Sequence, residues 1–301
     1  MSFCEKLSYF CYICGMKQIL LLFATLFISC STVNQVSVTS REKLSKGVKV
    51  IMADYTVNKE GVQLPTKLFV MDVKLSDKVT ILATVSGDNN ASIKATKELQ
   101  TEIAPISKQL EAMQAKRPNI KVLGGVNSDF YLINRSNMIL GAMYRGGECL
   151  KGEIESSSNL FIIFKDGTAH CMTGEEYLVM DKTLIAEAVS GRHMLLNDGV
   201  IQSKETRLEP RTAIGVTKNG KRVFILVGDG RRKEYSNGLS HADMALIFRK
   251  LGAYDAINLD GGGSSSFSLS VGDGKFAPKN RPSDRAGERF VPNGLAVVRL
   301  Q

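Results

Sequence analysis

A strand-like apolar run in this chain ends in one carboxylate, followed directly by three glycines and three serines. The apolar run covers residues 256–259, and the carboxylate is that of Asp260. Successive glycines lose much conformational entropy on folding, so a folded protein keeps them mainly where the backbone needs a positive φ or lies against another group. A tight turn is one such place and a ligand-binding loop is another. The hydroxyl groups that follow favour a ligand site, formed by Asp260, Gly261, Gly262, Gly263, Ser264 and Ser265.

The size and charge of the chain narrow the classes of ligand. A chain of 301 residues with 44% hydrophobic content can bury a large core, as one big domain or two closely merged ones. The formal net charge of +9 favours anionic partners such as phosphorylated or acidic sugars. Because the basic residues are dispersed, with no long run and no interleaved aromatic residues, no nucleic-acid partner is expected.

The N-terminus has the pattern of an export signal. Lys17 precedes an apolar run over residues 19–28, and Ser29 and Cys30 follow it. We therefore expect residues 1–30 to be a signal segment, Cys30 to be lipidated and to anchor the protein to a membrane, and residues 31–47 to be a flexible tether. This pattern predicts an exported, periplasmic or cell-surface lipoprotein. An uncleaved membrane anchor is the alternative, although the run is short for a bilayer span.

Hydrophobic periodicity predicts an α+β fold. Alternating and continuous apolar runs predict a β-rich part over residues 48–90, and turn residues predict hairpins around Asp166 and Asn219. Helical spacing predicts one helical stretch from Ser92 to Pro118, bent or restarted at a proline, and a second helix capped by Ser240. Hairpins combined with helix-bearing crossovers predict a mixed β-sheet core with packed helices, and residues 91–301 are expected to form the main domain.

Carboxylate and amide side chains recur where apolar strands run into glycine. Because neighbouring strands of a sheet end at a common edge, such side chains can converge in one site. A single aspartate beside glycine is more often a turn residue, so the joint recurrence carries the functional interpretation. The residues are Asn127, Asp129, Asp198, Asp229 and Asp260, with Arg231 two residues after Asp229.

Arginines supply candidate anion-binding groups, because a guanidinium binds phosphate or carboxylate oxygens in a bidentate manner. Arg211 lies beside Thr212 at the start of a predicted hairpin strand, and Arg281, Arg285 and Arg289 cluster near the C-terminus. A solvated loop is the alternative for the last three.

Several motifs together resemble those of the phosphodiester glycosidase family, over roughly residues 90 to 300. The resemblance implies a hydrolase that removes a sugar from a sugar–phosphate diester by cleavage at the anomeric carbon. The chain has Ser128 where the family often has glycine, which we expect to narrow the pocket. The motifs are PRTAIGV from Pro210, GDGR from Gly228, AINLDGGGSSSF from Ala256 and NRPSDRAGERFVPNGL from Asn280, with GGVNSDFY and NDG upstream.

Glycoside cleavage requires stabilisation of positive charge at the anomeric carbon, and usually an acid that protonates the leaving oxygen. A phosphate monoester leaves easily because its second pKa is roughly 6. On this hypothesis Asp260 or Asp229 faces the anomeric carbon as nucleophile or base, while Arg211 holds the phosphate. The expected supporting groups are Thr212 and the loop from Gly261 to Ser265 for the phosphate, and Asn127, Asp129 and Asn293 for the sugar.

Two other functions fit parts of the same pattern. A metal-dependent phosphodiesterase would use several aspartates, but His170, His193 and His241 lack the spacing of zinc ligands. We expect no cofactor, with calcium or magnesium held by aspartate oxygens as the open alternative. A non-catalytic surface lipoprotein that binds acidic or phosphorylated glycans is the second alternative.

Cys149 and Cys171 could form a disulfide or remain two buried thiols.

Overall fold

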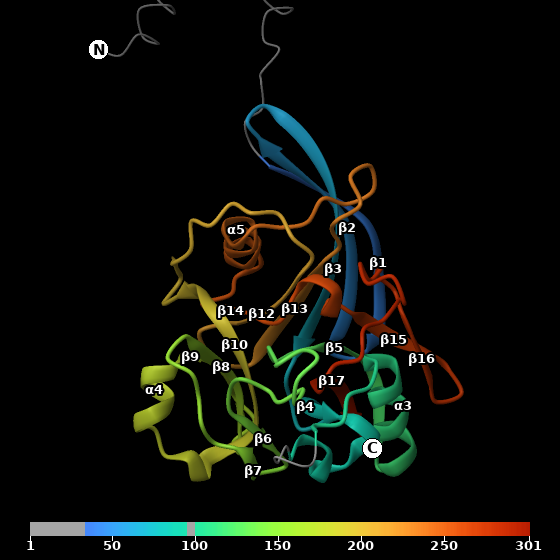
Figure 1. Cartoon of the computed structure of the whole chain (residues 1–301), viewed down its shortest axis with the longest axis vertical. Helices are drawn as coiled ribbons and strands as arrows, with labels where there is room; N and C mark the ends of the chain where they lie inside the picture. The colour runs from blue at the N-terminus through green and yellow to red at the C-terminus, as the bar shows by residue number, and fades with distance from the viewer. Residues whose placement is uncertain (1–33, 95–99) are drawn as a thin grey trace, which may run out of the picture. The chain divides into compact units, whose positions relative to one another are not determined.

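Two antiparallel β-sheets make up the core of the computed structural model, which describes residues 34–94 and 100–301 (Figure 1). The larger sheet has the order β1-β2-β3-β13-β12-β14-β10-β6-β7, with β8 and β11 also paired to β10 and β9 paired to β8. The smaller sheet has the order β16-β15-β5-β17-β4. The strands are β1 (Gln35–Ser45), β2 (Val48–Lys59), β3 (Val62–Lys74), β4 (Val79–Val85), β5 (Ile120–Asn127), β6 (Met143–Arg145), β7 (Glu148–Lys151), β8 (Ser158–Phe164), β9 (Ala169–Thr173), β10 (Ile185–Asn197), β11 (Val200–Ile201), β12 (Arg211–Val216), β13 (Arg222–Gly228), β14 (Asp255–Asn258), β15 (Phe267–Gly272), β16 (Lys275–Pro278) and β17 (Asn293–Leu300).

The prediction of an α+β fold with a mixed sheet is wrong. Every pair of neighbouring strands in the described residues is antiparallel, and these residues form three α-helices, α3 (Ile106–Lys116), α4 (Gly174–Val179) and α5 (His241–Leu251). The crossover through α5 does bring β14 back parallel to β13. However, β12 lies between these two strands and is antiparallel to both, so no parallel pair forms.

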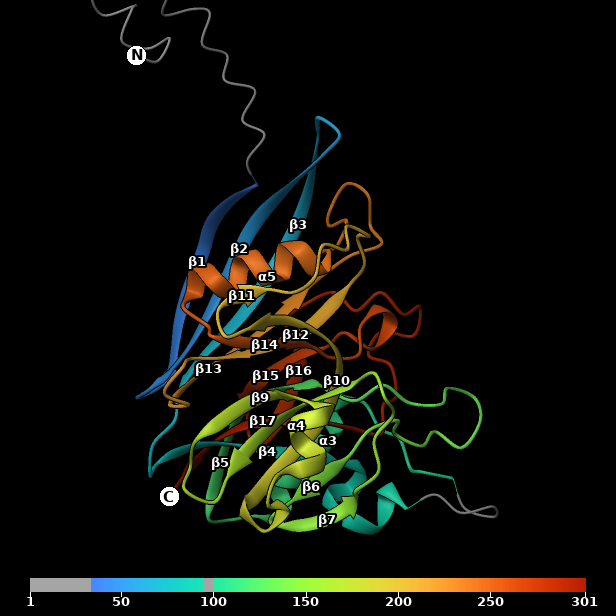
Figure 2. The same ribbon diagram turned by 90° about the vertical axis from the view of Figure 1, so that its left-hand side faces the viewer.

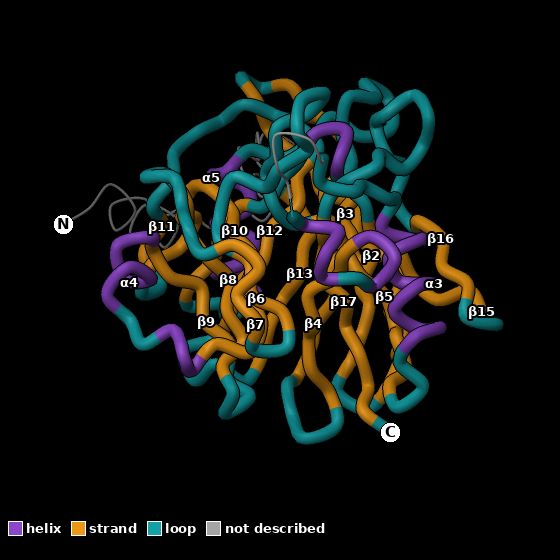
Figure 3. The backbone as a smooth tube through the Cα atoms, turned by 60° about the horizontal axis from the view of Figure 1, so that its bottom comes forward, coloured by secondary structure: helices purple, strands orange, loops and turns teal. Residues whose placement is uncertain are grey.

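The apolar faces of the two sheets pack against each other. The largest buried cluster joins Met71 and Ile225 of the large sheet to Val126, Phe267 and Val297 of the small sheet. Two helices cover the other faces (Figure 2): α5 packs on the large sheet and α3 on the small one. The shorter helix α4 lies beside β8 and β9, away from α3 (Figure 3). The inner core therefore holds the two sheets in a fixed relation.

The hairpins β8–β9 and β12–β13 and the helix α5 confirm the local predictions. Ser240 caps α5: its hydroxyl accepts a hydrogen bond from the Asp243 N–H, and the Asp243 carboxylate accepts one from the Ser240 N–H. Gly252 ends the helix with φ of 90°. The other predicted helix is shorter than expected, because α3 begins only after Pro105, which suits a helix start but not a helix interior.

Much of the expected tether is a strand. Residues 35–45 form β1, which pairs with β2 through main-chain hydrogen bonds while most of its side chains remain exposed. An exposed edge strand needs no apolar alternation, which explains its tether-like composition. The signal segment and Cys30 lie outside the described residues. No described helix is long and apolar enough to cross a membrane.

The β-rich part over residues 48–90 shares both sheets with the rest of the chain. Strand β3 pairs with β13 in the large sheet, and β4 pairs with β17 in the small sheet. The chain therefore passes from one sheet to the other between β3 and β4, and position 90 does not separate two β-structures.

Replacement of Ser240 tests the cap of α5. Ser240→Ala leaves the Asp243 N–H without its partner, so we expect the free energy of unfolding to fall by about 1–2 kcal/mol. The matched control, Ser156→Ala at an exposed loop position, should change it by less than about 0.5 kcal/mol. Chemical denaturation measures the free energy of unfolding of both variants, and equal stability of the two would contradict the assignment of Ser240 as the cap of α5.

Candidate active site

A pocket of about 410 Å³ brings the glycine loop and the first residue of β12 together. The register of the sheet explains this proximity, because β14 pairs with β12 and the Leu259 N–H donates to the Thr212 carbonyl at 2.9 Å. The loop that leaves β14 therefore lies beside the start of β12. The lining residues are Phe130, Arg207, Glu209, Arg211, Arg231, Asp260, Gly261, Gly262, Gly263 and Arg289.

The glycines let two guanidinium groups lie directly against the loop backbone. A Cβ atom at Gly263 would lie 2.2 Å from Nη2 of Arg289, and one at Gly262 would lie 3.2 Å from Nη2 of Arg231. Gly262 also has φ of 61°, a left-handed conformation that favours glycine. The loop thus holds arginine side chains on its surface, which any larger residue at Gly263 would displace.

The lining of the pocket is positively charged. It contains four arginines and two carboxylates, those of Glu209 and Asp260. Glu209 is occupied by ion pairs to Arg207 at 2.6 Å and to Arg231 at 2.8 Å. Although burial raises the pKa of Glu209, its hydrogen bonds to these two arginines lower it overall. Such a pocket is suited to an anion with several oxygens, such as a phosphate group.

Asp260 is the carboxylate in the lining that no arginine pairs with. It is partly exposed, and its Oδ1 accepts a hydrogen bond from the Gly261 N–H at 2.9 Å. Desolvation raises its pKa to about 6, while hydrogen bonds from Ser264 and Gly261 and the charge of Arg289 act in the opposite direction. Asp260 is therefore mostly ionised at neutral pH and can act as a nucleophile or a base.

Asp229, the other candidate for the same role, does not line the pocket. It is buried, and its carboxylate accepts hydrogen bonds from the side chain of Asn280 at 3.0 Å and the backbone N–H of Arg281 at 2.9 Å. Tyr235 donates a third, at 3.2 Å. Burial raises the pKa of Asp229, and these donors counteract part of the rise. Asp229 thus anchors the loop that carries Arg281.

Asn127 holds the loop of Asp260 in place from the buried side of the loop. Its side-chain amide donates to the Asp260 carbonyl at 2.6 Å, and its oxygen accepts from the Thr212 hydroxyl at 2.8 Å and the Ser266 N–H at 3.1 Å. Asn127 and Thr212 are both fully buried. They position the loop and do not reach the pocket, contrary to the expectation that Asn127 contacts a sugar.

Asp129 and Asn293 form a second buried pair. The Asn293 amide donates to Asp129 at 2.8 Å, and the Ser190 N–H donates to the same carboxylate at 3.0 Å. Burial raises the pKa of Asp129 to about 7, against the lowering effect of these donors. Ser128 also points inward, because its hydroxyl donates to Asn293 at 3.0 Å. Ser128 therefore does not narrow the pocket, and Asp129 and Asn293 do not line it.

The remaining predicted residues divide between the site and elsewhere. Ser264 and Ser265 are buried behind the glycines, where Ser264 accepts a bond from Arg289 at 3.5 Å. Asp198 lies in the turn between β10 and β11, where its N–H donates to Asp255 at 2.9 Å. Since Asp255 begins β14 and Asp260 follows its end, Asp198 is at the wrong end of the strand to reach the pocket.

Sequence reasoning missed three charged residues of the site. Arg207 and Glu209 line the pocket, and Glu205 contacts Arg211 at 3.1 Å and His241 at 3.4 Å. They lie in an irregular segment before β12, where only the alternation of charges could have drawn attention to them. His193 packs against His241, with ring centroids 4.7 Å apart and a tilt of 40° between the rings.

The described residues contain neither a cluster of metal-ligand side chains nor a disulfide between the two cysteines. These residues include no group of three His, Cys, Asp or Glu side chains arranged to hold a metal ion. Cys149 is exposed and Cys171 is buried, and they do not form a disulfide.

Comparison with known protein families identifies the chain. A family model of phosphodiester glycosidases matches residues 121–298, more than half of the chain. The chain belongs to the phosphodiester glycosidase family. The match includes Asn127, Arg211, Asp260 and Arg289, so the pocket lies within the region that defines the family. A search of curated proteins finds no match.

Solved structures share this fold at low sequence identity. The catalytic domain of zebrafish N-acetylglucosamine-1-phosphodiester alpha-N-acetylglucosaminidase, auto-inhibited by its pro-peptide, is similar with a TM-score of 0.62 and 19% identity, over 88% of this chain and 87% of that one. A hypothetical protein from Synechocystis has a TM-score of 0.57 and 14% identity, over 88% and 64%. A protein from Burkholderia pseudomallei has 0.58 and 12%, over 88% and 97%.

Replacement of Gly263 tests the packing of Arg289 on the loop. The new methyl group in Gly263→Ala would displace the guanidinium of Arg289, so we expect inorganic phosphate to bind about tenfold more weakly, by loss of one charge-assisted contact. Gly152→Ala, whose Cβ meets only ordinary or slightly tight contacts far from the pocket, is the matched control. Isothermal titration calorimetry measures both. Unchanged affinity in Gly263→Ala would show that Arg289 does not hold the anion.

Proposed function

We propose that this protein is an exported hydrolase that cleaves the glycosidic bond of a sugar–phosphate diester and releases the sugar. The observation that carries the proposal is the pocket in which Asp260 faces the same space as Arg211, Arg231 and Arg289. A carboxylate suited to a cationic anomeric centre thus lies beside groups suited to a phosphate. Family membership supports the same reaction class.

The arginines of the pocket explain why one reacting carboxylate is enough for this reaction. Glycosidases usually pair a nucleophile or base with an acid that protonates the leaving oxygen. Here the leaving group is a phosphate monoester, which departs as an anion, so arginine contacts can replace protonation. Asp260 either attacks the anomeric carbon or takes the proton of an attacking water, and the C–O bond to the phosphate breaks with its electron pair on the phosphate oxygen.

Arg211 is held ready for the phosphate by neighbouring groups. Its Nε donates to the Leu239 carbonyl at 3.1 Å, and its Nη2 contacts Glu205 at 3.1 Å and the Arg207 carbonyl at 3.2 Å. Its Nη1 has no hydrogen-bond partner within residues 34–94 and 100–301. A fixed guanidinium with one free edge loses little conformational entropy when it binds an oxyanion.

Export and membrane attachment belong to the proposal as well. They are supported by the charged start, the apolar run and Cys30 in the first 30 residues. On this basis the protein is a periplasmic or cell-surface lipoprotein that acts on phosphorylated glycans outside the cytoplasm.

Replacement of Asp260 separates catalysis from binding. We expect Asp260→Asn to lower turnover of a synthetic sugar–phosphate diester by about 10²-fold or more, because the group that reacts is removed, while phosphate binding persists. Asp198→Asn, at the far end of β14, is the matched control and should retain full turnover. If Asp260→Asn turns over as fast as the unaltered protein, a non-catalytic glycan-binding protein or a metal-dependent phosphodiesterase becomes the better account.

The pH profile tests the ionisation of Asp260. Its pKa is raised to about 6 by burial, so the reactive carboxylate form is lost as the pH falls through 6. We expect kcat/KM to decline about tenfold per pH unit below this value, since one proton inactivates the group. A phosphodiester substrate does not ionise in this range, so the decline reports the enzyme. A flat profile between pH 7 and pH 5 would be incompatible with the role of Asp260.

A further inference from the structure

Cations without ion-pair partners gather at the ends of the strands far from the active-site pocket. All are exposed, and none has an ion pair within residues 34–94 and 100–301. In contrast, each arginine that lines the active-site pocket pairs with a carboxylate. The set, called the basic end below, consists of Lys74, Lys78, Lys121, Lys218, Lys221 and Arg299.

Main-chain pairing places these residues side by side. The Leu75 N–H donates to the Lys221 carbonyl at 2.9 Å, which brings the end of β3 to the β12–β13 turn. The Leu300 N–H donates to the Lys78 carbonyl at 3.0 Å, and Arg299 is the register partner of Lys121. The basic end is therefore one continuous surface built from both sheets.

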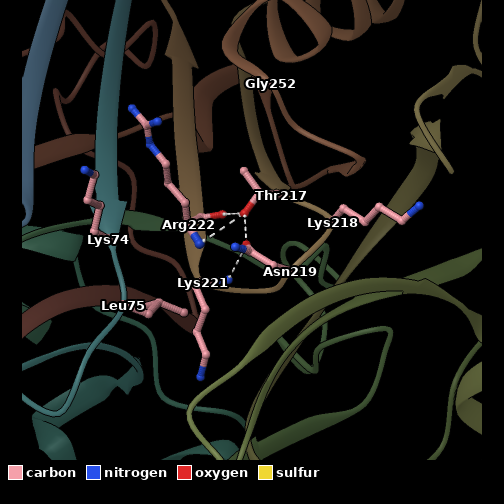
Figure 4. A pocket seen from close by; sticks show the side chains of 8 residues that line it. All are labelled: Lys74, Leu75, Thr217, Lys218, Asn219, Lys221, Arg222 and Gly252. Atoms are coloured by element: carbon pink, nitrogen blue, oxygen red, sulfur yellow. Dashed lines mark hydrogen bonds between the residues drawn. The ribbon is translucent and has the colours of Figure 1, made fainter.

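Three shallow pockets adjoin one another on this surface. A pocket of about 740 Å³ lies at the β12–β13 turn, and Figure 4 shows Lys74, Lys218 and Lys221 at it, with their side chains pointing in different directions. A second pocket of about 530 Å³ shares Lys74 with the first, and a third of about 320 Å³ shares Lys78 and Arg299 with the second. Three adjoining hollows with shared basic rims fit successive units of a chain-like ligand.

Few acidic groups offset this charge. Arg222, also on the first pocket, is neutralised by two hydrogen bonds of 2.7 Å to Asp72. Asp77 lines the second pocket, and Asp166 lies close enough to Lys221 for that lysine to lower its pKa. The six cations therefore leave a clear excess of positive charge, which attracts a polyanion.

The basic end is remote from the reacting groups. Arg211 begins β12 and Val216 ends it, while Asn293 begins β17 and Arg299 lies near its end. Strands of six to eight residues span about 20 Å or more. A small sugar–phosphate bound at Asp260 therefore cannot contact the basic end, but a polymer can reach both.

We propose that the basic end binds a polymer with repeated phosphate groups, a phosphoglycan chain, and so holds a polymeric substrate while the pocket cleaves it. This inference rests on the proposed function for the nature of the polymer. The excess of positive charge and the three adjoining pockets support such a ligand.

The lining of the basic end fits a glycan better than nucleic acid or a bilayer. No aromatic side chain lines the three pockets, although base stacking on aromatic rings is the usual means of holding single-stranded nucleic acid. None of the large exposed apolar side chains of the described residues lines them either, so nothing there inserts into a membrane.

The test compares two triple variants of the full chain. Lys74→Gln, Lys78→Gln and Lys221→Gln together remove charge from the basic end, and Lys59→Gln, Lys94→Gln and Lys279→Gln remove the same charge from exposed positions outside it. We expect long-chain inorganic polyphosphate, the probe, to bind the first variant about tenfold or more weakly and the control as tightly as the unaltered protein, with affinity that falls as salt rises. Cleavage of a small diester should be equal in all three proteins.

Equal polyphosphate affinity in both variants would overturn the inference. Tighter binding to phosphatidylglycerol vesicles or to a DNA oligonucleotide than to polyphosphate, lost in the same variant, would overturn it too. The small-diester assay is independent: cleavage without polyphosphate binding contradicts the basic end alone, and polyphosphate binding at the basic end without cleavage contradicts the proposed function alone.

Discussion

The active site depends on one buried amide that joins the two sheets. Asn127 ends β5 in the small sheet, and its side chain bonds both the hydroxyl of Thr212 in β12 and the carbonyl of Asp260 in the loop that follows β14 of the large sheet. The same amide accepts a hydrogen bond from the Ser266 N–H, so its loss would leave three groups without this partner, and the two in buried residues, Thr212 and Ser266, would cost about 1–3 kcal/mol each. The apolar core between the sheets holds them together. The hydrogen bond from Asn127 then fixes the position of Asp260, the reactive carboxylate, relative to both sheets.

The electrostatics of the pocket follow from the same loop. Since the glycines have no side chains, Arg231 and Arg289 pack against the backbone, and the carboxylates of Glu209 and Asp284 hold these arginines in place. Glu209 is saturated by arginines and Asp260 is not, although both line one pocket. Two carboxylates thus differ in pKa because of their neighbours, and this difference assigns the reactive role to Asp260.

Local sequence signals predicted the parts of the fold that local interactions determine. The capping box of Ser240 and Asp243 and the turn around Asn219 are complete within a few residues, so helix α5 and the β12–β13 hairpin were predictable. The sheet type was not, because it depends on β12 lying between β13 and β14, which pattern alone does not reveal. By contrast, Arg211 and Asp260 lie close together because β12 begins and β14 ends at the same edge of the large sheet, which is the kind of convergence expected of strand ends. Which aspartates lie in the pocket depends on distant partners such as Asn280.

The most direct test of the account is a crystal structure with a sugar phosphate bound. The account predicts the phosphate against Arg211 and the loop from Gly261 to Gly263, with the anomeric carbon about 3–3.5 Å from a carboxylate oxygen of Asp260. A sugar phosphate bound with its anomeric carbon beside another carboxylate, or bound outside this pocket, would contradict it.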